Sequence, residues 1–172
     1  MIEVIDNNEY LKSKAYTGLT RKGFSDNKEY LDRLNEELDT IIECGLSDFM
    51  LIVAYTVRFL KHHDIVVGPG RGSVGGSLVA WCIGITEIDS IKYGLSFARF
   101  LNKARMATSL GDIDIDISQE DRPRALELLK KEYGEDRTYQ IINDVYFTDK
   151  TAIQDLGRIF GVPADVRNRL TA

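Results

Sequence analysis

Cysteine, histidine and proline are scarce in this sequence, which has 2, 2 and 3 of them among 172 residues. Cys44 and Cys82 each lie in an apolar stretch and lack the paired spacing of a zinc site, so we expect two buried free thiols. His62 and His63 are adjacent at the end of a predicted helix, where neighbouring side chains diverge by about 100°. These scarcities disfavour a disulfide scaffold and a Cys/His metal centre.

Long hydrophobic runs are also missing. The longest apolar stretch, 78–85, is far shorter than the roughly 20 residues that cross a bilayer, so we expect no membrane partner. The amino terminus carries acidic residues where a secretion signal carries Lys or Arg. With 44% hydrophobic and 28% charged residues, the composition is typical of one globular domain, or a piece of a larger one, in the cytoplasm.

Charge is distributed unevenly along the chain, although the net charge of −5 argues against a uniformly basic nucleic-acid binder. Residues 1–60 contain 11 acidic and 7 basic side chains, and residues 112–172 contain 13 and 9. Residues 61–111 reverse the balance, with 3 acidic and 6 basic side chains, and include most of the glycine. The middle segment is therefore where we expect an anionic ligand to bind.

The spacing of apolar residues and the turn residues between them predict both helices and strands. The expected helices cover 8–19, a segment from Ser25 or Asp26 to Cys44, 48–60, 73–84, 118–133 and 150–160. The expected strands cover 65–67, 112–117 and 138–142. A glycine-rich loop between the first strand and the following helix is an arrangement that holds phosphate groups.

Aspartate and isoleucine alternate over residues 112–117, which is unusual because Asp is a poor strand former. In an extended segment Asp112, Asp114 and Asp116 share one face, about 7 Å apart, and repel one another unless cations lie between them. A solvated or charge-protected strand edge is the purely structural explanation. The other is a site for divalent metal, with these aspartates as ligands.

The kind of metal follows from the spacing. A calcium loop that began at Asp112 would need Gly at its sixth position and Glu at its twelfth, where this chain has Ile117 and Pro123. The remaining candidates are Mg²⁺ or Mn²⁺, hard cations that favour carboxylates and commonly act in pairs on phosphates. We expect two ions.

The glycine loop admits more than one interpretation. Residues 70–75 match the dinucleotide-binding pattern GxGxxG, with Glu87 and Asp89 near the expected acidic position, so a nicotinamide-dinucleotide binder is one alternative. The mononucleotide pattern GxxxxGK[ST] fails because Gly76 occupies the position of its lysine. A tight turn without a ligand is the structural alternative. The interpretations that include a ligand share a backbone that closely approaches an anion beside a helix N-terminus, with Arg71 adding charge.

Taken together, an anion cradle and a row of carboxylates some forty residues later favour nucleotidyl transfer. In that chemistry two metal ions activate an attacking hydroxyl and neutralise the leaving pyrophosphate. The cradle and its arginine would position a triphosphate for in-line attack.

At these residues the sequence also resembles a known family, the alpha subunit of the bacterial C-family replicative DNA polymerases (DNA polymerase III). The motifs 68–73, 76–80, 97–102 and 112–116 occur in that family's order and approximate spacing. The resemblance extends back through 36–65 and forward through 134–136, 150–152 and 157–158, so it covers most of the chain.

The resemblance implies a fold and a division of the chain. It implies an α/β (α+β) palm similar to the polymerase-beta nucleotidyltransferases, with a small mixed sheet backed by several helices. All of 1–172 would be a palm segment, with a helical part at 1–64 and the glycine loop and carboxylate sheet at 65–172. A bacterial cell or a virus-infected bacterium would be the source.

The resemblance also implies roles for individual residues. Asp112 and Asp114 would be two of three catalytic carboxylates, with Asp116 supporting them as a metal ligand. The residues that would contact the triphosphate are Gly72, Ser73, Arg71 and Arg99. Lys150 and Arg105 would be further site residues whose role is less defined. The implied partners are dNTP, primer-template DNA and the remaining polymerase segment.

Two departures from the family pattern affect what activity we expect of this chain by itself. Gly111 stands where the family usually has proline, and the third carboxylate and the fingers would lie beyond this chain. We therefore expect a split subunit or a fragment that is inactive alone. The alternative is a non-catalytic palm-like module that binds a nucleotide or a polymerase partner.

Overall fold

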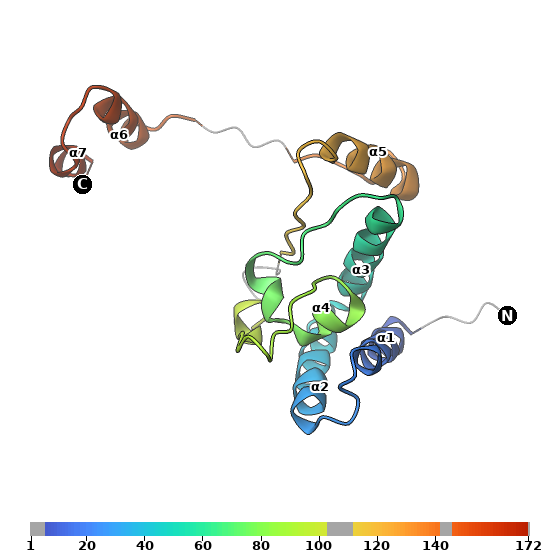
Figure 1. The fold of residues 1–172 in the computed structure, drawn as a ribbon. Helices are drawn as coiled ribbons and strands as arrows, with labels where there is room; N and C mark the ends of the chain where they lie inside the picture. Colours follow the sequence, from blue (N-terminus) through green and yellow to red (C-terminus); the bar gives the residue numbers. More distant parts are fainter. Residues whose placement is uncertain (1–5, 103–111, 142–145, 172) are drawn as a thin grey trace. The chain divides into compact units, whose positions relative to one another are not determined.

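The computed structural model describes residues 6–102, 112–141 and 146–171 (Figure 1). The chain divides into two compact units, Met1–Arg137 and Thr138–Ala172. Within the described ranges, every regular element is helical. The elements of the first unit are α1 (Asn7–Arg21), α2 (Lys28–Glu43), α3 (Ser47–His62), the 3₁₀ turns η1 (Gly72–Gly76) and η2 (Phe97–Arg99), α4 (Leu78–Ile83) and α5 (Arg122–Tyr133).

The expected α/β fold with a small mixed sheet is wrong for the residues that the structure describes. Of the three expected strands, 65–67 and 112–117 meet at one antiparallel bridge, between Val67 and Ile117. One bridge does not make a sheet, because a strand needs a ladder of backbone partners along its length. Residues 138–141 form no regular element, and Ile142 lies outside the described residues.

The expected helices are present with shifted ends. The N-cap of α2 is Asn27 rather than Ser25 or Asp26, because the Asn27 side chain accepts from the N–H of Glu29. Helix α5 begins at Arg122 rather than Ser118, with Pro123 in its first turn. The expected helix 73–84 is divided at Ser77 into η1 and α4. Consecutive glycines at the end of η1 disfavour a continuous α-helix there.

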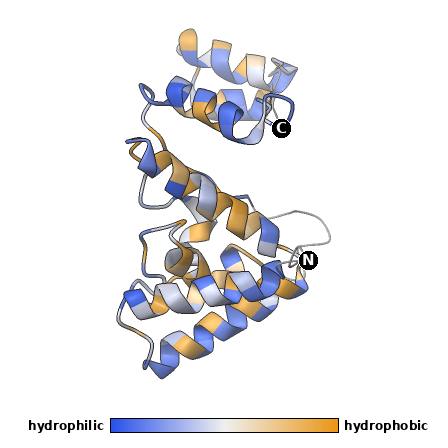
Figure 2. Cartoon of the chain, turned by 90° about the vertical axis from the view of Figure 1, so that its right-hand side faces the viewer, coloured by the Kyte–Doolittle hydropathy of each residue, from blue (hydrophilic) through white to orange (hydrophobic). Residues whose placement is uncertain are grey.

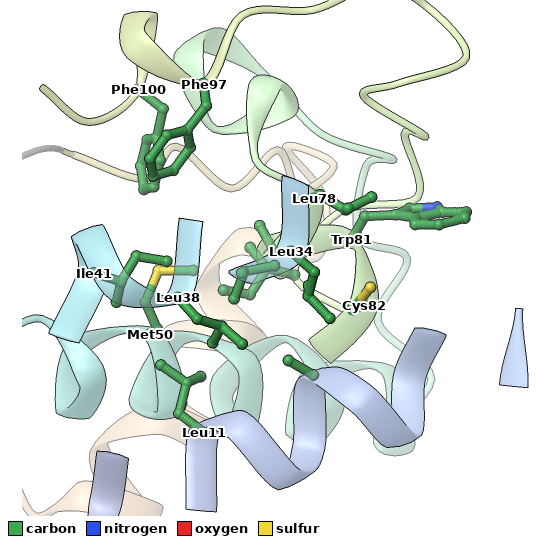
Figure 3. Packing of buried hydrophobic residues seen from close by; sticks show 14 of the residues in the cluster. Leu11, Leu34, Leu38, Ile41, Met50, Leu78, Trp81, Cys82, Phe97 and Phe100 are labelled. Atoms are coloured by element: carbon green, nitrogen blue, oxygen red, sulfur yellow. The ribbon is translucent and has the colours of Figure 1, made fainter. Parts of the chain in front are cut away.

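The core of the first unit lies where α1, α2 and α3 meet α4 (Figures 1 and 3). Leu34 and Leu38 of α2 and Met50 of α3 are essentially fully buried in it. Gly18 allows α1 and α4 to approach closely, because a Cβ atom there would lie 1.9 Å from the carbonyl oxygen of Cys82. The helices are amphipathic, with apolar and polar residues on different sides, as Figure 2 shows.

Burial separates the two cysteines. Cys82 lies in the core, and burial raises the pKa of its thiol to about 12, so this thiol stays protonated at neutral pH. Cys44 is half-buried, and both thiols are free. The expectation of free thiols is confirmed, and that of complete burial holds for Cys82 alone.

The second unit is a pair of helices, α6 (Asp149–Ile159) and α7 (Ala164–Leu170). The Thr148 side chain caps α6 by accepting from the N–H of Thr151. Helix α6 has a pronounced apolar face, yet none of its side chains is fully buried. Leu156, Ile159 and the following Phe160 are all more than half exposed.

No single helix among the described residues is long and apolar enough to cross a membrane. Helices α2 and α3 meet the length and composition requirement only as a pair, and the chain bends by 112° between them.

Tyr30 connects α2 to the loop that leads to η2. Its hydroxyl donates to Oδ2 of Asp89 at 2.8 Å, and its ring stacks on Phe24 with centroids 4.1 Å apart. The other oxygen of Asp89 accepts from the N–H groups of Ile91 and Lys92, which shapes the loop. Burial, and then the hydrogen bond to Asp89, raise the pKa of Tyr30 to about 12.

The raised pKa predicts an alkaline loss of stability. Above pH 10 the unfolded chain loses the Tyr30 proton more readily than the folded chain, so the free energy of unfolding falls until the pH passes about 12. We expect Tyr30→Phe to lose about 1 kcal/mol at pH 7 and to show a weaker decline between pH 9 and pH 11 in urea titrations. Tyr93→Phe, at an exposed tyrosine, is the matched control and should follow the wild type. Equal alkaline declines for wild type and Tyr30→Phe would contradict this account.

Candidate nucleotide and metal site

The aspartate segment 112–117 lies extended, with its two kinds of side chain on opposite faces. Asp112, Asp114 and Asp116 are exposed, while the isoleucines between them are half-buried. Ile115 and Ile117 pack against the smaller apolar cluster between α3 and α5. The sequence-based expectation of an outward acidic face and an inward apolar face is therefore confirmed, although the segment belongs to no sheet.

The glycine loop runs beside this segment. The N–H of Gly68 donates to the carbonyl oxygen of Asp116 at 2.9 Å. Gly72 has φ +66°, and a Cβ atom there would lie 3.4 Å from Oδ2 of Asp114. A side chain at Gly72 would be strained by this φ and would lie in van der Waals contact with this carboxylate. Glycine therefore brings the backbone and the Asp114 carboxylate into direct proximity.

Arg71 joins the two segments electrostatically. Its Nη1 donates to Oδ1 of Asp116 at 3.0 Å, with both side chains exposed. This hydrogen bond, then the charges of Asp116 and Asp114, raise the pKa of Arg71, so the guanidinium stays protonated. An exposed ion pair contributes about 0–1 kcal/mol, so Arg71 can exchange Asp116 for another anion at little cost.

Arg99 lies on the second of the two turns. It ends η2, which packs against η1, and its side chain is exposed. At the contact between the two turns a Cβ atom on Gly76 would lie 2.4 Å from the carbonyl oxygen of Ser96. Ser73 lies within η1. Gly72 and Ser73 thus lie in η1, Arg71 directly precedes it, and Arg99 ends the turn that touches η1.

Lys150 and Arg105 are the other two predicted residues. Lys150 lies in the first turn of α6, in the second unit. Arg105 lies outside the described residues, as does Gly111.

The expected helix N-terminus at Ser73 falls in the 3₁₀ turn η1, and the α-helix that follows has its first N–H groups engaged within the protein. Helix α4 begins only at Leu78. The N–H of Val79 donates to Glu37 at 3.0 Å, and that of Ala80 donates to Oγ of Ser77 at 3.1 Å. These donors are therefore engaged within the protein.

The carboxylates suit Mg²⁺ or Mn²⁺ chemically, because both ions prefer oxygen ligands. Within the described ranges, however, no group of three or more His, Cys, Asp or Glu side chains is arranged to hold one ion. Asp112 and Asp114 could supply part of a ligand set, with the remainder coming from elsewhere.

The dinucleotide-binding alternative finds little support. The acidic residues proposed for it are engaged elsewhere, Glu87 with Lys61 and Asp89 with Tyr30. Lys61 also lowers the pKa of Glu87. The glycine loop of the described chain lacks the parallel sheet and long helix that surround a dinucleotide.

Sequence reasoning missed one polar pair, Arg33 and Glu37 of α2. Glu37 is fully buried, and Arg33 donates to it and to the carbonyl oxygens of Gly76 and Leu95. A signal was available: Glu37 lies three residues after Leu34 and four before Ile41, on the apolar face of α2. An acidic residue at such a position needs buried donors.

One cleft of the first unit involves none of these residues. It has a volume of about 560 Å³ between α1 and α4 and is lined in part by Lys14, Arg21, Lys22 and Arg58. None of the predicted site residues lines it.

Comparison with known proteins identifies the class. Residues 9–172 match the family described as the bacterial DNA polymerase III alpha NTPase domain, and the chain belongs to this family. The resemblance expected from the motifs is confirmed at that level.

Particular relatives agree with this class. The DNA polymerase III subunit alpha of Aquifex aeolicus is 42% identical over 166 residues, which are 94% of this chain and 14% of the relative. That of Ureaplasma parvum is 42% identical over 170 residues, 96% of this chain and 17% of the relative. That of Yersinia pestis is 44% identical over 140 residues, which are 81% of this chain and 12% of the relative. The chain thus spans less than a fifth of the length of these relatives.

The contact between η1 and η2 predicts a sharp difference between two adjacent glycines. A methyl group on Gly76 would overlap the backbone of Ser96, whereas one on Gly75 would make ordinary contacts with Ile88 and Leu95. We expect Gly76→Ala to reduce the free energy of unfolding by about 1–3 kcal/mol and Gly75→Ala to have a much smaller effect. Urea titration measures both, and equal losses would show that the two turns do not touch as described.

Proposed function

We propose that this chain is the palm segment of a DNA polymerase III alpha subunit and holds the incoming dNTP and its metal ions during primer extension. The term palm denotes the part that carries catalytic carboxylates and implies no sheet. The observation that carries the proposal is the proximity of Gly72 to Asp114, where a Cβ atom would lie 3.4 Å from the carboxylate oxygen, with Arg71 alongside. Membership of the polymerase family supports it.

In this proposal Asp112 and Asp114 hold the metal ions, and Asp116 supports them. Two bound Mg²⁺ or Mn²⁺ ions supply activation of the primer 3′ hydroxyl and neutralisation of the departing pyrophosphate. The chain's own part is to present the carboxylates on a fixed face. The half-buried isoleucines fix that face by anchoring the segment, Ile113 to the main core and Ile115 and Ile117 to the smaller apolar cluster.

The triphosphate would lie along the two turns. Gly72 allows the backbone to approach the phosphates, because a glycine at φ +66° adds no side chain at the approach, and Ser73 follows it in the same turn. Arg71 and Arg99 are exposed and add positive charge. Pre-positioned charge of this kind stabilises a transferring phosphoryl group without reorganisation.

Completion of the active site requires a further polymerase segment in this proposal. A third carboxylate and the fingers would come from that segment, together with the contacts to primer-template DNA. The exposed apolar side chains of the second unit are consistent with a surface that another segment covers, Leu156, Ile159 and Phe160 among them. We therefore propose that the chain alone is inactive.

The metal-holding role predicts a loss of binding when two carboxylates are neutralised. We expect Asp112→Asn with Asp114→Asn to weaken binding of the Mn²⁺–dATP complex at least about tenfold, as measured by calorimetry. Glu120→Gln with Glu127→Gln removes the same charge from exposed positions of the same unit and should leave the affinity within about twofold. Equal losses in the two double variants would indicate a general effect of charge and count against the proposed ligands.

The incomplete site predicts a clear result in primer extension. The chain with Mg²⁺, primer-template DNA and all four dNTPs should give no synthesis. Addition of a chain carrying the fingers and the third carboxylate should restore synthesis, and the Asp112→Asn, Asp114→Asn variant should abolish that gain. Synthesis by the chain alone would refute the split site, and nucleotide binding that never leads to synthesis in the mixture would favour the non-catalytic module.

A further inference from the structure

The buried carboxylate of Glu37 gathers donors from two elements. Its Oε1 accepts from Nε of Arg33 at 2.6 Å, within the same helix. Its Oε2 accepts from Oγ of Ser77 at 2.9 Å and from the N–H of Val79 at 3.0 Å. Glu37 therefore ties α2 to the start of α4, the point where the glycine turn η1 ends.

Arg33 continues the connection toward the second turn. Its Nη2 donates to the carbonyl oxygen of Gly76, the last residue of η1, at 3.0 Å. The same nitrogen donates to the carbonyl oxygen of Leu95, two residues before η2, at 3.3 Å. Its guanidinium also lies 5.9 Å from the centre of the Phe97 ring. One planar group thus bonds to the last residue of η1 and to the segment that leads into η2, and lies over the first ring of η2.

Burying the Arg33–Glu37 ion pair costs desolvation free energy, which a purely apolar core avoids. Burial raises the pKa of Glu37, while the hydrogen bonds from the α4 backbone and Arg33 act in the opposite direction. Replacing a buried ion pair by apolar residues is often neutral or stabilising, so stability alone does not explain this pair. What the pair supplies, and apolar side chains do not, is directed bonding to specific carbonyl and amide groups.

We propose that Arg33 and Glu37 are positioning residues of the triphosphate site, which fix the spacing between η1, with Gly72 and Ser73, and η2, with Arg99. Neither residue needs to touch the nucleotide. Glu37 is fully buried, and Arg33 uses Nε on Glu37 and Nη2 on the two carbonyl oxygens. The inference rests on the proposed function, because the turns it connects carry the proposed triphosphate contacts.

The test separates positioning from general stability. Arg33→Lys keeps the positive charge but loses the planar fork, and Arg33→Met loses both. We expect each to weaken Mn²⁺–dATP binding by at least about fivefold at a temperature where the chain stays folded. Leu38→Ala leaves a cavity in the core on the same helix and serves as the stability control, with affinity within about twofold of wild type.

Hydrogen exchange of the chain without nucleotide provides the second measurement. In both Arg33 variants, backbone amides of 73–77 and 97–101 should exchange faster relative to those of α1, whereas Leu38→Ala should raise exchange without this preference. Glu37→Gln, which keeps the shape but loses the charge, should change both measurements in the same direction as Arg33→Lys.

The possible failures are distinguishable. If the wild-type chain does not bind Mn²⁺–dATP, the proposed function is overturned and the positioning role falls with it. If the wild type binds and the Arg33 variants bind equally well, or if Leu38→Ala loses as much affinity as they do, the positioning role alone is overturned. Unchanged exchange in both turns of the Arg33 variants would also overturn it.

Discussion

A buried negative charge constrains the arrangement of the glycine loop. Glu37 is shielded from water on α2, so its carboxylate must find hydrogen-bond donors inside the protein. It finds them in Arg33, Ser77 and Val79, and Arg33 then bonds to Gly76. The hydrogen bonds that satisfy the buried Glu37 carboxylate thereby hold the end of η1 and the start of α4 in place.

The acidic segment 112–117 shows how a functional face can exist without a sheet. Its isoleucines anchor it through apolar contacts, and its aspartates remain exposed, so hydrophobic burial orients the carboxylates. A single bridge, which includes the hydrogen bond from Gly68, and the ion pair between Arg71 and Asp116 hold it beside the glycine loop. Exposed carboxylates that lie near glycine backbone are accessible to an ion and a phosphate together, which is the requirement of the proposed nucleotide site.

Periodicity predicted most helices, though not α7, and it predicted the strands poorly, for a physical reason. Helical hydrogen bonds form within one segment, so apolar spacing and caps near Asn27 and Gly134 are enough to locate α2 and α5. A strand depends on partners elsewhere in the chain, and residues 138–141 have an extended-type sequence without forming a strand. The expected long helix is interrupted at Gly75 and Gly76, which end η1. The backbone of Gly76 there packs directly against the backbone of Ser96.

The sequence alone determined the alternation at 112–117, the glycine-rich loop and the family resemblance, because these are properties of residue order. Only the tertiary structure decided that Asp114 lies beside Gly72, that Arg71 reaches Asp116, and that a buried Glu37 organises the turns. Such proximities join residues about forty positions apart. They follow from how the whole core packs, and no local pattern encodes them.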